Sequence, residues 1–342
     1  MFAIGSLNIK NQVISAPMAG ISTRTFRDIL RFYGAGLSWG EMISAQALVY
    51  QNQKTFDLLG LDDEAAIRAV QLSGSRPEVL AEAARLVVER GAQIIDLNLG
   101  CPAPKIVRNG EGCKLMKDPV LIGRLISAVR EAVTVPVTAK MRLGWMDGQI
   151  NFLEVARILE AHGADAITLH ARTREQFYSG QADWNCLSRL SGTVKIPVIG
   201  NGDVFTAQAA QEMLKQTGCA AIMVGRGMVG NPWLIRDCVA VLEGGCPPPE
   251  PGYAEKINQA LQHLQLQVAH DIKLWQQKTE SPSQAQQEGE AAAVRSMRGH
   301  LGWYLKGLPQ AAAVRSRLNQ LTSVEQIKEL FAVWLCQIGV NL

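Results

Sequence analysis

The sequence predicts an α/β chain, a (β/α)8 TIM barrel followed by a small all-helical domain at the C-terminus. Short apolar or β-branched runs alternate with longer segments of helical spacing through about residue 242, as in a parallel sheet with helical crossovers. After Gly244 only helical spacing remains. The length of 342 residues suits one large domain and a smaller one.

Eight short runs have the composition of buried strands, and helix signals separate them. Pro77 stands near one helix start and Gly91 near its end, while Asp118 and Pro119 have the positions of an N-cap and a first helical residue. An open doubly wound sheet is the alternative, but it lacks a G-x-G-x-x-G after the first strand. The predicted strands are 13–17, 37–41, 68–72, 94–98, 137–141, 166–170, 198–200 and 221–225.

A Gly- and Pro-rich stretch in the sequence predicts the boundary between the two domains. The barrel is expected over residues 1–242, and "GGCPPPEPG" indicates a linker over 243–252. A helical domain is expected over 253–342. Within it, the polar low-complexity stretch "QQKTESPSQAQQEGEAAA" predicts a mobile insertion at about 276–292.

Charge, hydropathy and cysteine content argue against secreted, membrane-spanning, disulfide-bonded and thiolate-metal proteins. A net charge of +3 points to no particular partner. The first twenty residues lack the pattern of a signal peptide, and no apolar run approaches the roughly 18 residues that span a bilayer. Seven scattered cysteines without a C-x-x-C pair argue against disulfides and thiolate metal sites. We therefore expect a cytoplasmic protein without membrane, metal or obligate protein partner.

Polar residues stand at the carboxyl ends of the predicted strands, where barrels of this kind have their active sites. Any one of them could simply be a residue leaving the core, but the series as a whole predicts a site. Its members are Pro17-Met18, Glu41, Gln71, Asn98, Lys140, His170, Asn201 and Gly225-Arg226.

The last two strand ends predict a phosphate site. "GNGDVFT" and "VGRGMVG" follow them, and glycines let the backbone N–H groups approach an anion. Tight turns alone are the alternative. A phosphate-bearing cofactor near Gly202, Gly225 and Arg226 is the preferred interpretation.

Two further side chains suit a flavin. A buried Lys140 needs an anionic partner such as a reduced flavin, and Gln71 can donate and accept at a pyrimidine edge. The alternative for Lys140 is a salt bridge to Glu41 or Asp96. His170 fits the site and a satisfied core position equally well.

A thiol follows the fourth strand in "DLNLGCPAPKIV". With an ordinary pKa near 8.5, Cys101 would be protonated and able to donate its proton, as a general acid does. Gly110 and Gly112 could hinge a lid over the site. The role of Cys113 stays open, and the remaining cysteines are expected to be small buried residues: Cys186, Cys219, Cys238, Cys246 and Cys336.

The ordered set of motifs resembles the bacterial tRNA-dihydrouridine synthases from about Ala16 to the C-terminus. The motifs are "APMAG", "SWGEM", "VQLSGS", "DLNLGCPAPKIV", "AKMRLGW", "LHARTREQFYSGQADW", "NGDVFT" and "VGRGMVGNPW". The resemblance implies a flavoprotein that binds FMN in a (β/α)8 barrel and is reduced by NADPH. It further implies reduction of the C5–C6 double bond of particular uridines in tRNA to dihydrouridine, by hydride delivery to C6 and a proton to C5.

The resemblance also implies roles for individual residues. Cys101 would be the proton donor. Asn98, Arg142 and Arg172 would face the substrate. The sequence departs from the family pattern at Ser22-Thr23 and within "GEGCKL". The cofactor-binding residues would be Pro17, Met18, Ala19, Gln71, Lys140, His170, Asn201, Gly202, Asp203, Gly225 and Arg226.

The C-terminal stretch "VRSMRGHLGWYLKGLPQAAAVRSRL" resembles the family's helical RNA-binding domain, and its charge agrees with tRNA as partner. Basic residues occur in it without Asp or Glu, and Trp303 and Tyr304 lie among them. A solvated basic helix face is the alternative. The basic residues are Arg295, Arg298, Lys306, Arg315 and Arg317.

Two other functions remain as alternatives. A small-molecule pyrimidine or enone reductase could use the same barrel, although it would not need a basic appendage. A non-catalytic RNA-binding protein could retain a degenerate barrel, although Cys101, Lys140 and Gln71 are all present.

Overall fold

The computed structural model describes residues 2–61 and 67–340, and the chain forms two compact units. One unit comprises the chain up to Gly227 together with Leu234–Pro247. The other comprises Met228–Trp233 and the chain from Pro248 onward. The short segment Met228–Trp233 thus belongs to the second unit although it lies within the sequence of the first.

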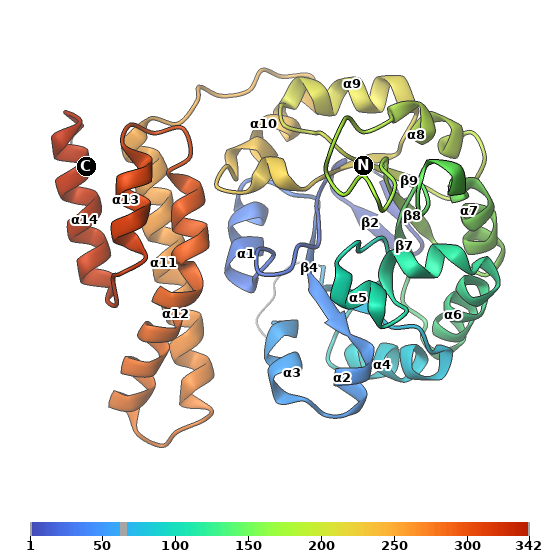
Figure 1. The fold of residues 1–342 in the computed structure, drawn as a ribbon, viewed down its shortest axis with the longest axis horizontal. Coiled ribbons are helices and arrows are strands. Elements are labelled where there is room, and N and C mark those ends of the chain that lie inside the picture. The colour runs from blue at the N-terminus through green and yellow to red at the C-terminus, as the bar shows by residue number, and fades with distance from the viewer. Residues whose placement is uncertain (1, 62–66, 341–342) are drawn as a thin grey trace. The chain divides into compact units, whose positions relative to one another are not determined.

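The first unit is a closed barrel of eight parallel strands, in which β10 pairs with β3 (Figure 1). Closure excludes the open sheet, and all eight predicted strands are confirmed with ends shifted by at most a few residues. The strands are β3 (Val13–Ser15), β4 (Leu37–Ser44), β5 (Ala69–Ser73), β6 (Ile94–Leu99), β7 (Val137–Arg142), β8 (Ala166–His170), β9 (Val198–Asn201) and β10 (Ala221–Val224).

Helices surround the strands, and their ends follow the sequence signals. α4 begins at Pro77, and the Asp118 carboxylate caps α6 by accepting from Leu121 N at 2.9 Å. The helices are α1 (Arg24–Phe32), α2 (Ala45–Val49), α3 (Gln53–Leu59), α4 (Pro77–Glu89), α5 (Pro104–Arg108), α6 (Pro119–Ala132), α7 (Phe152–Ala161), α8 (Trp184–Ser191), α9 (Ala207–Thr217) and α10 (Trp233–Leu242), with 3-10 turns η1 (Gly112–Lys117), η2 (Asp147–Gln149) and η3 (Arg226–Met228).

A short antiparallel hairpin precedes the barrel, and the sequence analysis missed it. Its strands are β1 (Phe2–Ile4) and β2 (Leu7–Ile9), too short to show alternation clearly. Ile4 and Ile9 are fully buried in one apolar cluster with residues of the barrel strands, including Ile14 and Ile94. The hairpin thereby contributes to the barrel core, while the carboxyl ends of the strands border the cavity described below.

The second unit is helical: α11 (Tyr253–Gln276), α12 (Pro282–Tyr304), α13 (Ala311–Leu318) and α14 (Val324–Gln337). None of the helices within the described ranges is long and apolar enough to cross a membrane. Tyr304 is buried, with its hydroxyl 3.3 Å from His263 Nδ1, so it belongs to the core of this unit. Trp303 is only partly buried.

The predicted mobile loop at about 276–292 is wrong from Pro282 onward, where α12 begins, and residues 277–281 alone connect α11 to α12. The Ser281 hydroxyl caps α12 by accepting from Gln284 N. The polar composition concealed small residues at helical spacing, Ala285, Gly289 and Ala293, and all three are buried. A Cβ on Gly289 would lie 2.6 Å from Ile272 Cα of α11, so the two helices pack closely there.

Candidate active site

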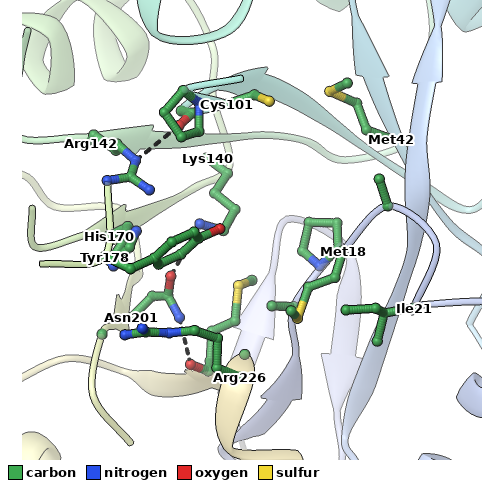
Figure 2. Close-up of a pocket in the computed structure, with 18 of the residues that line it drawn as sticks. Met18, Ile21, Met42, Cys101, Lys140, Arg142, His170, Tyr178, Asn201 and Arg226 are labelled. Carbon is green, nitrogen blue, oxygen red and sulfur yellow. Dashed lines mark hydrogen bonds between the residues drawn. The ribbon is translucent and has the colours of Figure 1, made fainter. Parts of the chain in front are cut away.

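A cavity of about 390 Å³ lies at the carboxyl ends of the barrel strands. Every residue given a catalytic, cofactor or substrate role from the sequence lines it except Arg172, and Glu41 of the strand-end series does not line it either. Figure 2 shows Cys101, Lys140 and Asn201 on one side of the space, with Met18, Ile21 and Met42 on the other. The cavity therefore has a polar wall and an apolar wall.

A directional chain of hydrogen bonds runs along the polar wall to Cys101. Gln71 Nε2 donates to Asp96 Oδ2 at 2.7 Å, and Asn98 Nδ2 donates to Gln71 Oε1 at 2.7 Å. Asn98 Oδ1 then accepts from Gly100 N and from Cys101 N, at 3.2 and 2.9 Å. The chain ends on one side at the Asp96 carboxylate, which only accepts, and on the other at the backbone N–H groups of Gly100 and Cys101, which only donate. The side-chain amides of Gln71 and Asn98 can therefore take only one orientation each.

Asp96 is the buried end of this chain. Burial raises its pKa to about 6, although hydrogen bonds from Gln71 and Thr138 oppose the shift. Thr138 Oγ1 donates to the carboxylate at 2.6 Å. The sequence analysis considered Asp96 only as a salt-bridge partner of Lys140, since a carboxylate inside a strand gives no signal of the amides that it orients.

Cys101 and Cys113 lie close in the fold but differ in environment. Cys101 lines the cavity and is partly exposed, and burial raises the pKa of its thiol, so that it carries a proton at neutral pH. Cys113 is buried, and its thiol donates to Gly100 O at 3.1 Å. Burial raises the pKa of Cys113 to about 12, which makes it a poor proton donor.

Lys140 extends from β7 into the cavity (Figure 2). Its Nζ donates to Asn201 Oδ1 at 3.1 Å, and Asn201 Nδ2 donates to Met223 O at 2.8 Å. Burial and the neighbouring Arg142 lower the pKa of Lys140 to about 8. Among the described residues Lys140 forms no salt bridge to Glu41 or Asp96, and Glu41 accepts instead from Gly20 N at 2.6 Å.

Arg142 and His170 complete the polar wall. The Arg142 guanidinium donates to three backbone carbonyls, those of Gly100, Thr173 and Phe177, at 2.7–3.0 Å. It therefore fixes the loop that carries Cys101. Burial, with Lys140 and the nearby arginines, lowers the pKa of His170 well below its ordinary value, so the ring is neutral at pH 7.

Arg172 is placed differently from the other predicted residues. It is buried and outside the cavity lining, where it donates to Ser179 O, Gly180 O and Asp203 Oδ2. Burial raises the pKa of Asp203, but the hydrogen bonds from Arg172 and from the Ala182 N–H outweigh it and lower the pKa. Arg172 thus anchors Asp203, whose other oxygen accepts from Arg226.

The first strand end is organised by Ser22, one of the two departures from the family motif. Its hydroxyl accepts from Met18 N at 3.0 Å and donates to Ala16 O at 2.8 Å. Ser22 is fully buried. The side chain thus holds the turn that presents Pro17, Met18 and Ala19 to the cavity.

Several lining residues were missed in the sequence analysis. Tyr178 and Phe205 are each about half exposed, and the Arg226 guanidinium lies 4.6 Å and 5.4 Å from the centres of their rings. Aromatic side chains in "EQFYSG" and "NGDVFT" were the available signal. The apolar members came from within strands or turns, where they look like ordinary core: Ile21, Met42 and Met223.

Comparison with solved structures agrees with the barrel fold. A 6-hydroxypseudooxynicotine amine oxidase from Pseudomonas geniculata N1 matches with a TM-score of 0.56 at 14% identity. A complex of 2-naphthoyl-CoA reductase with 2-naphthoyl-CoA matches with a TM-score of 0.53 at 12% identity. Each match covers 71% of this chain, and 49% and 52% of the respective solved chains, so this chain spans about half their length.

Sequence comparisons are more specific. A protein described as a probable tRNA-dihydrouridine synthase from Rickettsia bellii is 38% identical over 330 residues, which cover 96% of each chain. The tRNA-dihydrouridine synthase B of Pasteurella multocida is 38% identical over 323 residues, covering 94% of this chain and 92% of its own. The model of the dihydrouridine synthase family matches residues 14–335. The chain therefore belongs to the dihydrouridine synthase family.

Proposed function

We propose that this protein reduces the C5–C6 double bond of specific uridines in tRNA to 5,6-dihydrouridine, with FMN as cofactor and NADPH as reductant, in the cytoplasm. The observation that carries the proposal is the position of Cys101, a protonated thiol at the edge of a cavity that also contains Lys140. Membership of the dihydrouridine synthase family supports the reaction class.

The residues of the cavity fit FMN. The apolar wall of Met18, Met42 and Ile21 suits one face of a flat ring system. Lys140 and the amides of Gln71 and Asn201 suit its polar edge. Gly202, Gly225 and Arg226 combine backbone N–H groups with a positive charge at the last two strand ends, the usual place of a phosphate in such barrels.

Glycine is required at one of these positions. Gly202 has φ +130°, and a Cβ there would lie 2.6 Å from Ala182 Cβ. A side chain could not be added without shifting the loop, so the backbone itself faces the cavity at that point. We assign the cofactor-binding role to Pro17, Met18, Ala19, Gln71, Lys140, His170, Asn201, Gly202, Asp203, Gly225 and Arg226.

Side chains of the protein would donate the proton, position the donor and stabilise the developing charge. When bound, FMN kept reduced by NADPH would supply the hydride for C6 of the uracil. Cys101 donates its proton to C5, and the raised pKa keeps that proton on the thiol until it is needed. Asn98 holds the Cys101 backbone, and the charges of Lys140 and Arg142 favour negative charge developing on the uracil.

The substrate must enter as an extruded base. A uracil stacked in a duplex cannot reach the bottom of the cavity, and a loop base costs least to unstack. Asn98 and Arg142 line the cavity, and we assign them to the substrate side. Arg172 is assigned a positioning role through Asp203 instead. The helical unit would bind the tRNA through its exposed basic residues, among them Arg295, Lys306 and Arg317.

The test is a map of dihydrouridine in total tRNA from cells with and without this gene. Deletion is expected to remove dihydrouridine at defined positions, and the wild-type gene to restore it. Cys101→Ala is expected not to restore it. If deletion leaves the dihydrouridine map unchanged in a cell with no redundant enzyme, the proposal is wrong.

A further inference from the structure

Three cationic side chains gather around one indole ring on the rim of the barrel. The amine of Lys117 lies 4.1 Å from the centre of the Trp145 ring, the guanidinium of Arg174 lies 4.8 Å from it, and the amine of Lys114 lies 5.7 Å from it. None of the four residues lines the catalytic cavity. We refer to Lys114, Lys117, Trp145 and Arg174 as the rim cluster.

Three successive loops bring these residues together. Lys114 and Lys117 belong to η1 after β6, Trp145 follows β7, and Arg174 follows β8. All three loops leave the carboxyl ends of their strands, which is the end of the barrel that holds the cavity. Backbone bonds fix the junction, because Arg174 N donates to Gly144 O at 2.9 Å and Glu175 N donates to Trp145 O at 3.1 Å.

The positive charges of the rim cluster are not neutralised by the protein. Across residues 2–61 and 67–340, Lys114, Lys117 and Arg174 make no ion pair with a carboxylate and no side-chain hydrogen bond. Nε of Arg174 is buried without a hydrogen-bond partner. Of the two carboxylates that flank η1 in the sequence, Glu111 accepts from Ser73 at 2.5 Å and Asp118 caps α6.

Such an arrangement is costly unless an anion binds. Like charges brought to one ring repel each other, and the attraction of an aromatic face offsets this only in part. A buried guanidinium N–H without an acceptor adds a further cost. A phosphate group would offset the repulsion among the cations, because it carries the opposite charge and accepts from several donors.

We propose that the rim cluster binds phosphodiester groups of the RNA whose uridine enters the cavity. The inference rests on the proposed function, and it adds to it a second RNA contact, carried by the barrel itself. The two lysines are exposed at the surface, which suits a polymer running across the rim. A target base held in the cavity would fix the register of the flanking phosphates above these loops.

A phosphate of the nicotinamide donor is the competing occupant. The rim cluster favours RNA because its cations come from separate loops around one ring and none of them lines the catalytic cavity. The donor must instead bring its nicotinamide to the cavity.

The experiment measures tRNA affinity against salt with the FMN-loaded full-length protein. The probe is labelled total tRNA from cells that lack the gene. The variant is Lys114→Gln/Lys117→Gln, and the control is Lys195→Gln/Lys215→Gln. The control removes the same charge from exposed residues near the opposite end of the barrel, before β9 and at the end of α9.

Removing two phosphate contacts is expected to reduce the slope of log K against log salt by about 1.4 to 1.8, since each contact contributes roughly 0.7 to 0.9. The control variant is expected to keep the wild-type slope, and both are expected to keep the FMN affinity and the KM for NADPH. An unchanged slope in the Lys114/Lys117 variant overturns the inference. So does a raised KM for NADPH with an unchanged slope, which would assign the cluster to the donor.

Failure of the proposed function is visible separately. It would appear as absence of dihydrouridine formation by the wild-type protein, in an assay that does not involve the slope. The slope itself is a binding measurement and stays informative in that case.

Discussion

The proposed role of Cys101 as proton donor rests on the surroundings of its thiol and not on its residue type alone. Cys113, nearby on the same segment, is buried against a backbone carbonyl, with its pKa raised to about 12 by that burial. Cys101 faces the cavity with its backbone held by Asn98. The sequence could rank Cys101 above the other cysteines by its place after a strand. It could not settle Cys113, because packing against a distant carbonyl has no local pattern.

The hydrogen-bonded chain from Asp96 through Gln71 and Asn98 to Cys101 predicts different effects on turnover for two similar substitutions. Asn98→Asp places an oxygen against Gln71 Oε1, and Gln71 cannot turn without facing the Asp96 carboxylate. We expect turnover to fall tenfold or more, which corresponds to losing one hydrogen bond of roughly 1–2 kcal/mol. Steady-state kinetics with the folded variant measure this.

Asp96→Asn is the matched comparison. Its amide can donate to Thr138 Oγ1, whose own proton can turn to Ile95 O at 3.4 Å, and the oxygen still accepts from Gln71. We expect turnover close to wild type. Equal losses in both variants would mean that the direction of the chain is irrelevant.

Lys140 is expected to make folding stability depend on pH. Its folded pKa of about 8 is below its unfolded value of 10.5, so the unfolded chain binds more protons between these values. Stability therefore rises as pH rises through this window. Between pH 7 and 9.5 the wild-type free energy of unfolding should gain roughly 1–2 kcal/mol more than that of Lys140→Met.

Urea denaturation of the protein without flavin at the two pH values checks this expectation for Lys140. The comparison with Lys140→Met cancels the titration of other groups. If both proteins respond equally to pH, Lys140 is not held in a costly charged state.

Gly112, the first residue of η1, packs directly against the segment that carries the Cys101 thiol. Gly112 has φ +60°, and a Cβ there would lie 2.6 Å from Cys101 O and 3.0 Å from Cys101 Cβ. Gly112→Ala combines left-handed strain of about 1–2 kcal/mol with a clash against the segment that carries the thiol. We expect a loss of kcat of tenfold or more while FMN still binds.

Gly148→Ala is the control, since an added Cβ there meets no atom within 4 Å. Stopped-flow and steady-state assays measure kcat for both variants. The flavin spectrum checks that each variant is folded and binds FMN. A Gly112→Ala enzyme with wild-type kcat would show that the segment does not position Cys101.

The elements themselves differ in how well the sequence predicts them. The eight barrel strands are buried on both faces, so their apolar runs stand out between helix signals. The hairpin Phe2–Ile9 is too short for a periodic pattern, and α12 was hidden by its polar face. Strand ends gave most of the cavity lining, because strand direction alone brings them together. Arg172 shares that position but turns toward Asp203, which depends on loop contacts that no spacing reveals.

In the whole molecule, the proposed chemistry and the proposed tRNA binding by the helical unit depend on different residues. Arg295, Lys306 and Arg317 are exposed on the helical unit, whereas Arg298 donates to Leu321 O and has a structural role. Arg295→Gln/Lys306→Gln/Arg317→Gln should therefore raise the KM for tRNA by tenfold or more, since three phosphate contacts are lost. Turnover at saturating tRNA and FMN affinity should stay unchanged. A variant with a wild-type KM would remove the role given to these residues.

The proposed protonation of a tRNA uridine by Cys101 can be measured through single-turnover formation of dihydrouridine. FMN-loaded protein is reduced with NADPH, mixed with total tRNA from the deletion strain, and the product is followed by mass spectrometry. Cys101→Ala should slow product formation by roughly 10²–10⁴-fold, with flavin reduction by NADPH unaffected, and Cys113→Ala should retain the wild-type rate. Wild-type rates in Cys101→Ala, or no dihydrouridine from the wild-type protein, would contradict the account.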